Sequence, residues 1–180
     1  MDTISTKLHI ILGVSGKMKA FLALSIIAFL AGCSATGPKY GEVAPAFPSL
    51  DPSKVRMTFL REPKLLYVAL DARVEVDGGR VGSLASGAFT YIDQEPGQTV
   101  VTVDNWSFPG RYVISVNLSA GEEYFFEIFP RSESYMPGIL GGMIGLAIDA
   151  SVNENSGAFK VVPISKEAAE QKLLSLSFTH

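Results

Sequence analysis

The sequence predicts a mainly β fold: a small antiparallel β-sandwich with a glycine-rich apolar segment and a C-terminal α-helix. From position 55 onward, runs rich in Val, Tyr and Phe alternate in part with polar residues, as half-buried strands do. Turn signals interrupt these runs about every ten residues, a spacing typical of small sandwiches and barrels. Hydrophobic residues make up 47% of the 180 residues, which is enough for an ordinary core.

The strands are expected between these turns. An Asp-Gly pair at 77–78 has β-branched neighbours, which is a strong hairpin signal. Glu-Pro-Gly at 95–97 and Ser-Ala-Gly at 119–121 are further turns. The runs expected to hold strands are 55–61, 64–78, 87–106, 111–131 and 157–164.

A short helix is expected over 165–177. Ser165 is suited to the N-cap and Glu167 to the first turn of this helix. Its expected packing face consists of Ala169, Leu173, Leu174 and Leu176.

The glycine-rich segment 136–150 is uncharged from Met136 to Ile148 and holds four glycines at spacings that allow close helix approach. It is too short to span a bilayer. Two interpretations stay open, a buried connection on the sheet and a surface that contacts a membrane or a partner. The candidate contact residues are Met136, Ile139, Leu140, Met143, Ile144 and Leu146.

The amino terminus has the pattern of an export signal. Lys17 and Lys19 precede an uncharged run of 11 residues at 20–30, which matches the length of a signal-peptide core. Met1 or Met18 could be the start, since residues 18–33 already form a complete leader.

Cys33, the only cysteine, follows this run after Ala31 and Gly32. The four residues Leu30, Ala31, Gly32 and Cys33 resemble the bacterial lipobox, the recognition site of lipoprotein signal peptidase. The resemblance implies cleavage before Cys33 and attachment of several acyl chains, palmitate among them, which together anchor firmly. Residues 1–32 are then a removed signal peptide.

The resemblance also bears on location and organisation. Ser34 rather than aspartate follows Cys33, which by likeness to lipoproteins of enteric-type bacteria implies the outer membrane, facing the periplasm. Residues 33–53 are expected to form the lipidated cysteine and a flexible tether, because they are rich in proline and lack periodicity. The domain is expected to span 54–180.

Over roughly residues 55–176, the order of the turn residues resembles that of a bacterial lipoprotein family known as domain of unknown function 2846. The Asp-Gly pair at 77–78 with Val-Gly at 81–82, the Pro-Gly pair at 96–97, and Ala-Gly at 120–121 before Tyr124 carry the likeness. The first half also resembles a PEGA-type β-sandwich. This family has no agreed activity, so the resemblance implies a fold and no catalytic residue.

Composition disfavours several function classes. The net charge is −3, which gives no electrostatic reason to expect nucleic acid. The two histidines are His9, in the leader, and His180, the last residue, which weakens His-based catalytic and zinc sites. We therefore expect a non-catalytic protein without a cofactor, a metal or an evident small-molecule substrate.

Two residue sets leave alternatives open. Asp77, Asp93 and Glu95, the turn members of an acidic set with Asp71 and Glu75, could converge on a cation such as calcium or serve a hydrolytic site, although turns favour such residues anyway. The aromatic run over 124–129 is interpreted as core, with an exposed binding surface as the alternative.

The leading expectation is a lipid-anchored structural or interaction module of the bacterial cell envelope. Its partners would be the membrane, through Cys33, and another envelope protein. The alternatives are a carboxylate-based cation-binding or hydrolytic module and an accessory subunit of an envelope transport or secretion complex.

Overall fold

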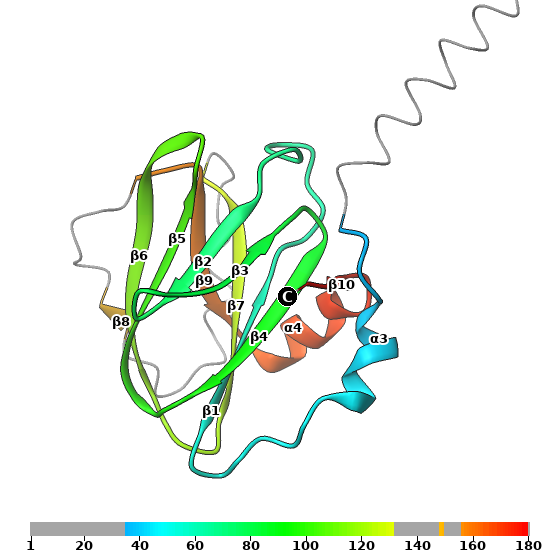
Figure 1. Cartoon of the computed structure of the whole chain (residues 1–180), viewed down its shortest axis with the longest axis vertical. Helices are drawn as coiled ribbons and strands as arrows, with labels where there is room; N and C mark the ends of the chain where they lie inside the picture. The colour runs from blue at the N-terminus through cyan, green and yellow to red at the C-terminus, as the bar shows by residue number, and fades with distance from the viewer. Residues whose placement is uncertain (1–34, 132–147, 150–155, 180) are drawn as a thin grey trace, which may run out of the picture. The chain divides into compact units, whose positions relative to one another are not determined.

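The computed structural model describes residues 35–131, 148–149 and 156–179, which form two β-sheets packed together with short helices beside them (Figure 1). This confirms the expected β-sandwich. The strands are β1 (Val55–Leu60), β2 (Ala72–Val76), β3 (Gly79–Leu84), β4 (Ala88–Gln94), β5 (Gly97–Asn105), β6 (Phe108–Leu118), β7 (Glu123–Pro130), β8 (Ile148–Asp149), β9 (Phe159–Ile164) and β10 (Ser177–Phe178). The helices are α3 (Tyr40–Val43), the 3₁₀ turn η1 (Ala44–Ala46) and α4 (Lys166–Leu173).

Within the described ranges, each sheet has five strands. The second sheet, in the order β3-β2-β5-β6-β8, is antiparallel throughout. The first sheet, in the order β10-β4-β1-β7-β9, is mixed, because β1 pairs with β7 and β10 pairs with β4 in parallel. The parallel pairs join strands that are distant in the chain, so local turn signals could not predict them.

The main core lies between the sheets. Met57 and Phe59 of β1 and Phe126 of β7 are fully buried there, with Val74 and Val103 of the second sheet in the same cluster. The rings of Phe59 and Phe126 stack with centroids 5.3 Å apart. Alternation along β2, with every second residue buried, is what a strand with one face in the core requires.

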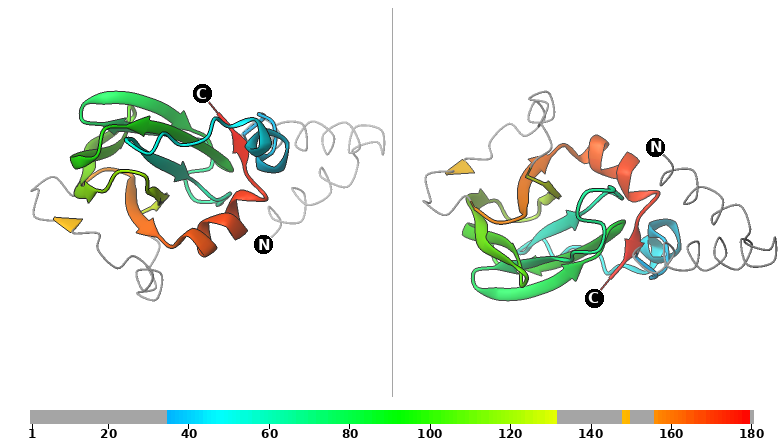
Figure 2. Two further views of the ribbon diagram at one scale, coloured as in Figure 1. Left: turned by 90° about the horizontal axis from the view of Figure 1, so that it is seen from below. Right: turned by 90° about the horizontal axis from the view of Figure 1, so that it is seen from above.

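The first sheet is also covered on its outer face. Leu60, Phe89 and Phe125 pack there against Ala169 and Leu173 of α4, and Figure 2 shows α3 and α4 beside this sheet. The two faces of β7 are therefore both buried. This confirms the interpretation of the aromatic run over 124–129 as core.

The expected flexible tether over 33–53 differs from the structure, in which residues 35–53 pack against the domain. Tyr40, Val43 and Phe47 contribute to the cluster under α4, and the backbone N–H of Phe178 donates to the carbonyl of Pro38 at 2.8 Å. The proline-rich composition predicts a linker, but the segment also carries three apolar side chains whose burial is favourable. The compact unit accordingly begins at Ser34 instead of position 54.

The C-terminal helix is shorter than expected. Its N-cap is confirmed, since the Ser165 hydroxyl accepts from the backbone N–H of Ala168 at 3.3 Å. The helix ends at Leu173, and the chain then forms β10 rather than continuing to residue 177. Leu174, which the sequence pattern places on the packing face, is instead 70% exposed.

The predicted Asp-Gly hairpin is confirmed. The prediction of a strand over 64–78 is wrong for the first half of that run. Asp77 and Gly78 have φ values of 50° and 77°, the left-handed pair that a tight turn between β2 and β3 needs. Residues 61–71 form a loop instead of a strand, and only 72–76 of the run is extended.

Candidate functional site

The residues singled out for lipidation and for partner contact fall outside the described residues. This holds for Leu30 to Cys33 and for the contact residues Met136, Ile139, Leu140, Met143, Ile144 and Leu146. Their assignments remain predictions. What the structure does provide is the place where the chain enters the fold, at Ala35, two residues after Cys33.

The acidic residues considered for a cation have other partners. Asp93 makes two hydrogen bonds of 2.7 Å with the guanidinium of Arg56, and Glu95 pairs with Lys54. Asp77 accepts from the backbone N–H of Val100. Among the described residues, no three Asp, Glu, His or Cys side chains come together as metal ligands would.

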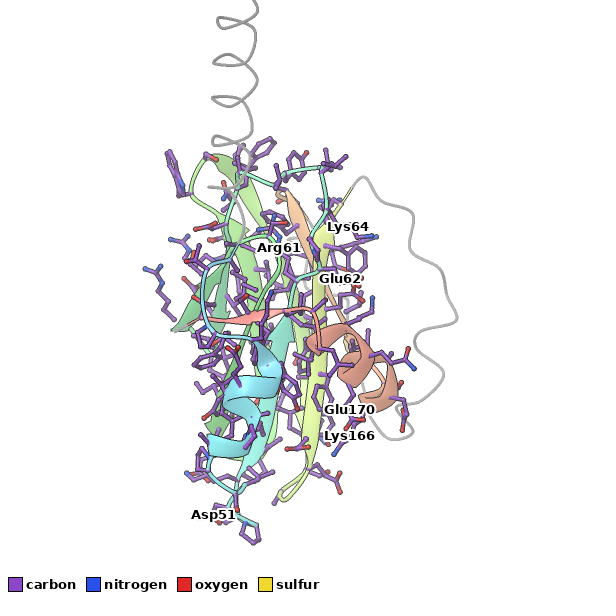
Figure 3. The ribbon with its side chains drawn as sticks, turned by 90° about the vertical axis from the view of Figure 1, so that its right-hand side faces the viewer. Asp51, Arg61, Glu62, Lys64, Lys166 and Glu170 are labelled. Carbon is purple, nitrogen blue, oxygen red and sulfur yellow. The ribbon has the colours of Figure 1, made fainter. Side chains whose placement is uncertain are left out.

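Three connections of the described chain lie at the end of the sandwich where Ala35 lies, which we call the loop end. They are the loop 61–71 between β1 and β2, residues 85–87 between β3 and β4, and the turn 105–108 between β5 and β6. The backbone N–H of Ala35 donates to the carbonyl of Ser86 at 3.0 Å. Figure 3 labels Lys64 toward this end and Asp51 at the opposite one.

Arg61 fixes the loop 61–71. Its side chain is 1% exposed and donates to the carbonyls of Tyr67, at 2.7 Å, Leu84, at 2.8 Å, and Leu70. The guanidinium also lies over the ring of Phe159 at 4.6 Å, a favourable cation–π contact. Burial lowers the pKa of Arg61 to about 10, so the side chain remains charged at neutral pH.

The turn between β5 and β6 is joined to this loop. The Asn105 side-chain amide donates to the carbonyl of Asp71 at 2.6 Å, and its oxygen accepts from the backbone N–H of Ser107 at 2.9 Å. The rings of Tyr67 and Phe108 lie 5.4 Å apart. Loop and turn are therefore held as one surface.

Four large apolar side chains on this surface face solvent. Leu65 is 95% and Trp106 is 87% exposed, and Leu66 and Phe108 are also exposed. We call Leu65, Leu66, Trp106 and Phe108 the apolar rim. Single exposed apolar side chains are common, but a group of them at one end of a domain marks a contact surface.

An open groove of about 710 Å³ runs beside the N-terminal segment. Its walls come from residues 35–38 and 43–47 on one side and from the β3–β4 corner and β10 on the other. Its described lining includes Ala85, Ala88, Phe47 and Phe178, and Asp71 is the one carboxylate among these described residues. The described lining is mostly apolar and brings together no convergent set of catalytic groups.

A charged cluster sits at the junction of α4 and the first sheet. Lys172 contacts Glu127 at 3.1 Å and also pairs with Glu62. Burial raises the pKa of Glu127. Burial by itself would raise the pKa of Glu62 as well, but hydrogen bonding, chiefly from Lys172, lowers it. The cluster fastens α4 to β7 and to the end of β1, which is a structural role.

Comparison of the chain with protein-family models, with curated proteins and with solved structures finds no match. Within the described ranges, the helices are all too short or too polar to cross a bilayer.

Sequence reasoning missed the loop end. The run "KLLYVAL" over 64–70 has the composition of a strand and belongs to the run 64–78 in which a strand is expected, whereas in the structure it is part of a loop. The signal that could have corrected this is Arg61 with Pro63 directly after β1, because proline and a charge seldom continue a central strand.

Proposed function

We propose that this protein is a lipid-anchored component of the bacterial cell envelope whose β-sandwich acts as a non-catalytic structural or interaction module. The observation that carries the proposal is the lipobox-like tetrapeptide ending at Cys33, placed two residues before the start of the described fold. The family resemblance of the turn pattern points in the same direction.

The packing of residues 35–53 supports a particular form of this function. Two residues span about 7 Å at most, so a lipid on Cys33 would hold the loop end close to the bilayer. A protein anchored through a long tether could search the periplasm, whereas this one would stay at the membrane surface.

The use of the acidic residues favours the non-catalytic reading over the cation-binding or hydrolytic one. Asp93 and Glu95 neutralise Arg56 and Lys54, and the Asp77 carboxylate accepts from the backbone N–H of Val100 on β5. An accessory role in an envelope transport or secretion complex agrees equally with an interaction module, and the partner that co-purifies from membranes would decide it.

Metabolic labelling with a palmitate analogue tests the anchor. The wild type is expected to be labelled and processed, and Cys33→Ser is expected to accumulate as unlabelled precursor. Ser34→Asp is the matched variant: it should still be labelled, but should move from the outer to the inner membrane fraction. Label that persists in Cys33→Ser would overturn the proposal.

A further inference from the structure

We propose that the apolar rim rests in the interfacial region of the membrane that holds the lipid on Cys33, so that the domain contacts the bilayer at two places. The proposal goes beyond the proposed function and rests on it for the anchor. The ligand of the rim is the bilayer itself, at the level of the headgroups and the first acyl carbons.

The first argument is position. Ser86 joins the entry of the chain to the rim, because its carbonyl accepts from the N–H of Ala35 and its hydroxyl accepts from the N–H of Lys64 at 3.3 Å. Lys64 directly precedes Leu65. The amino-terminal entry point and the rim therefore share one end of the sandwich, and a short connection to Cys33 would bring both to the same surface.

The second argument is distribution. Of the six large apolar side chains that are exposed in the described part of the chain, four form the rim. The other two are Leu174 after α4 and Val100 on β5, and Val100 lies beside the turn at 77–78, away from the loop end. An apolar surface collected at the end nearest the lipid is what a membrane contact requires, and no such collection is needed for solubility.

The third argument is that the residue types of the rim suit a membrane interface and that the rim is held in place by the fold. Tryptophan is favoured at the membrane–water interface, where its ring is partly in the apolar layer and its N–H remains hydrated. Leu65, Leu66 and Phe108 supply apolar area beside it. Arg61, Asn105 and the Tyr67–Phe108 contact hold the rim in place before binding, so contact costs little additional ordering.

Trp106 is the only tryptophan in the chain, so its fluorescence reports the rim directly. The protein purified from membranes is reconstituted in phosphatidylcholine vesicles, with and without brominated acyl chains. We expect a blue-shifted emission and strong quenching by the brominated lipid. An emission typical of water with no quenching would overturn the proposal.

Matched variants separate the rim from general surface effects. Leu65→Ser with Leu66→Ser keeps Trp106 and should reduce quenching, because apolar area equal to two leucines leaves the contact. Each lost leucine is expected to weaken the vesicle contact about tenfold. Val100→Ser changes an apolar side chain that is 38% exposed, against 39% for Leu66, beside the Asp77 turn at the other end of the sandwich, and should leave quenching unchanged. Equal loss in both variants would overturn the proposal.

The experiment distinguishes an error in the lipid-anchor proposal from an error in the proposal that the rim contacts the bilayer. The mass of the amino-terminal peptide reports lipidation independently of Trp106. If Cys33 is unmodified, its thiol is coupled to a maleimide phospholipid and the quenching is measured on the protein so anchored. A blue shift that depends on protein concentration and persists without vesicles would mean that a second copy covers the rim, and would overturn the membrane contact.

Discussion

Arg61 offers the sharpest test of how the loop end is built. Replacing it with methionine keeps a flexible apolar stem in the same space and removes the guanidinium. Three carbonyl groups, those of Tyr67, Leu70 and Leu84, then lose their donor. At about 1 kcal/mol for each unsatisfied buried carbonyl, the loss amounts to about 3 kcal/mol.

Part of this loss is offset because the variant no longer buries a charged guanidinium. We therefore expect Arg61→Met to lower the free energy of unfolding by about 2 kcal/mol, a fall in Tm of about 6–10 °C for a domain of this size. Arg61→Lys should lose nearly as much, since a single ammonium cannot reach three carbonyls in the geometry of a planar fork.

The assay is thermal unfolding, combined with amide hydrogen exchange in the loop 61–71. The amides of Val68 and Leu70 donate within this loop and should exchange faster in the variants, while the amides of β5 and β6 keep their protection. Arg80→Met is the control, because Arg80 is an exposed arginine on β3. A Tm for Arg61→Met equal to that of Arg80→Met would refute the reasoning.

Two further predictions concern the attachment of α4 and of the N-terminal segment. Lys172→Met should lower the free energy of unfolding by about 2 kcal/mol at pH 7, because two neighbouring carboxylates lose their shared cation. Without Lys172, burial raises the pKa of Glu62 in the folded state, and the pKa of Glu127, which burial already raises, moves further up. The loss of unfolding free energy relative to the wild type should therefore grow as the pH rises through the pKa values of these two carboxylates, and shrink below pH 4.5. Gly37→Ala should cost about 1–3 kcal/mol, since its Cβ would lie 1.9 Å from a backbone oxygen of β10, whereas Gly41→Ala, with open space around the Cβ, should be neutral.

Urea unfolding as a function of pH checks the first of these predictions, and a deficit that is constant from pH 3 to pH 8 would contradict it. Limited proteolysis within residues 35–53 checks the second. Equal cleavage of Gly37→Ala and Gly41→Ala would mean that this segment does not pack against the domain as described.

The parts of the fold that depend on local chemistry could be predicted from the sequence. The Asp-Gly turn at 77–78 needs two left-handed residues, and those residue types adopt that conformation readily. Ser165 caps a helix for an equally local reason. The alternation of buried residues in β2 follows from the period of a strand.

The remaining parts depend on distant contacts. β1 lies beside β7 although 62 residues separate Leu60 from Glu123, and neither strand carries a signal for the other. Leu65 and Leu66 have the residue type of a core position, but Arg61 donates to the carbonyls of Tyr67 and Leu70 and so holds this segment as a loop. The segment 35–53 looks like a linker because its three packing residues, Tyr40, Val43 and Phe47, stand among prolines and polar residues.

The mature amino terminus tests the central claim most directly. Mass spectrometry of the amino-terminal peptide, released from protein isolated from cell membranes, reads both the cleavage site and any modification. We predict a peptide that begins at Cys33 and carries a diacylglyceryl group on sulfur together with an acyl chain on its amino group. A peptide that retains residues before Cys33, or one that holds this cysteine as an unmodified thiol, would contradict the account.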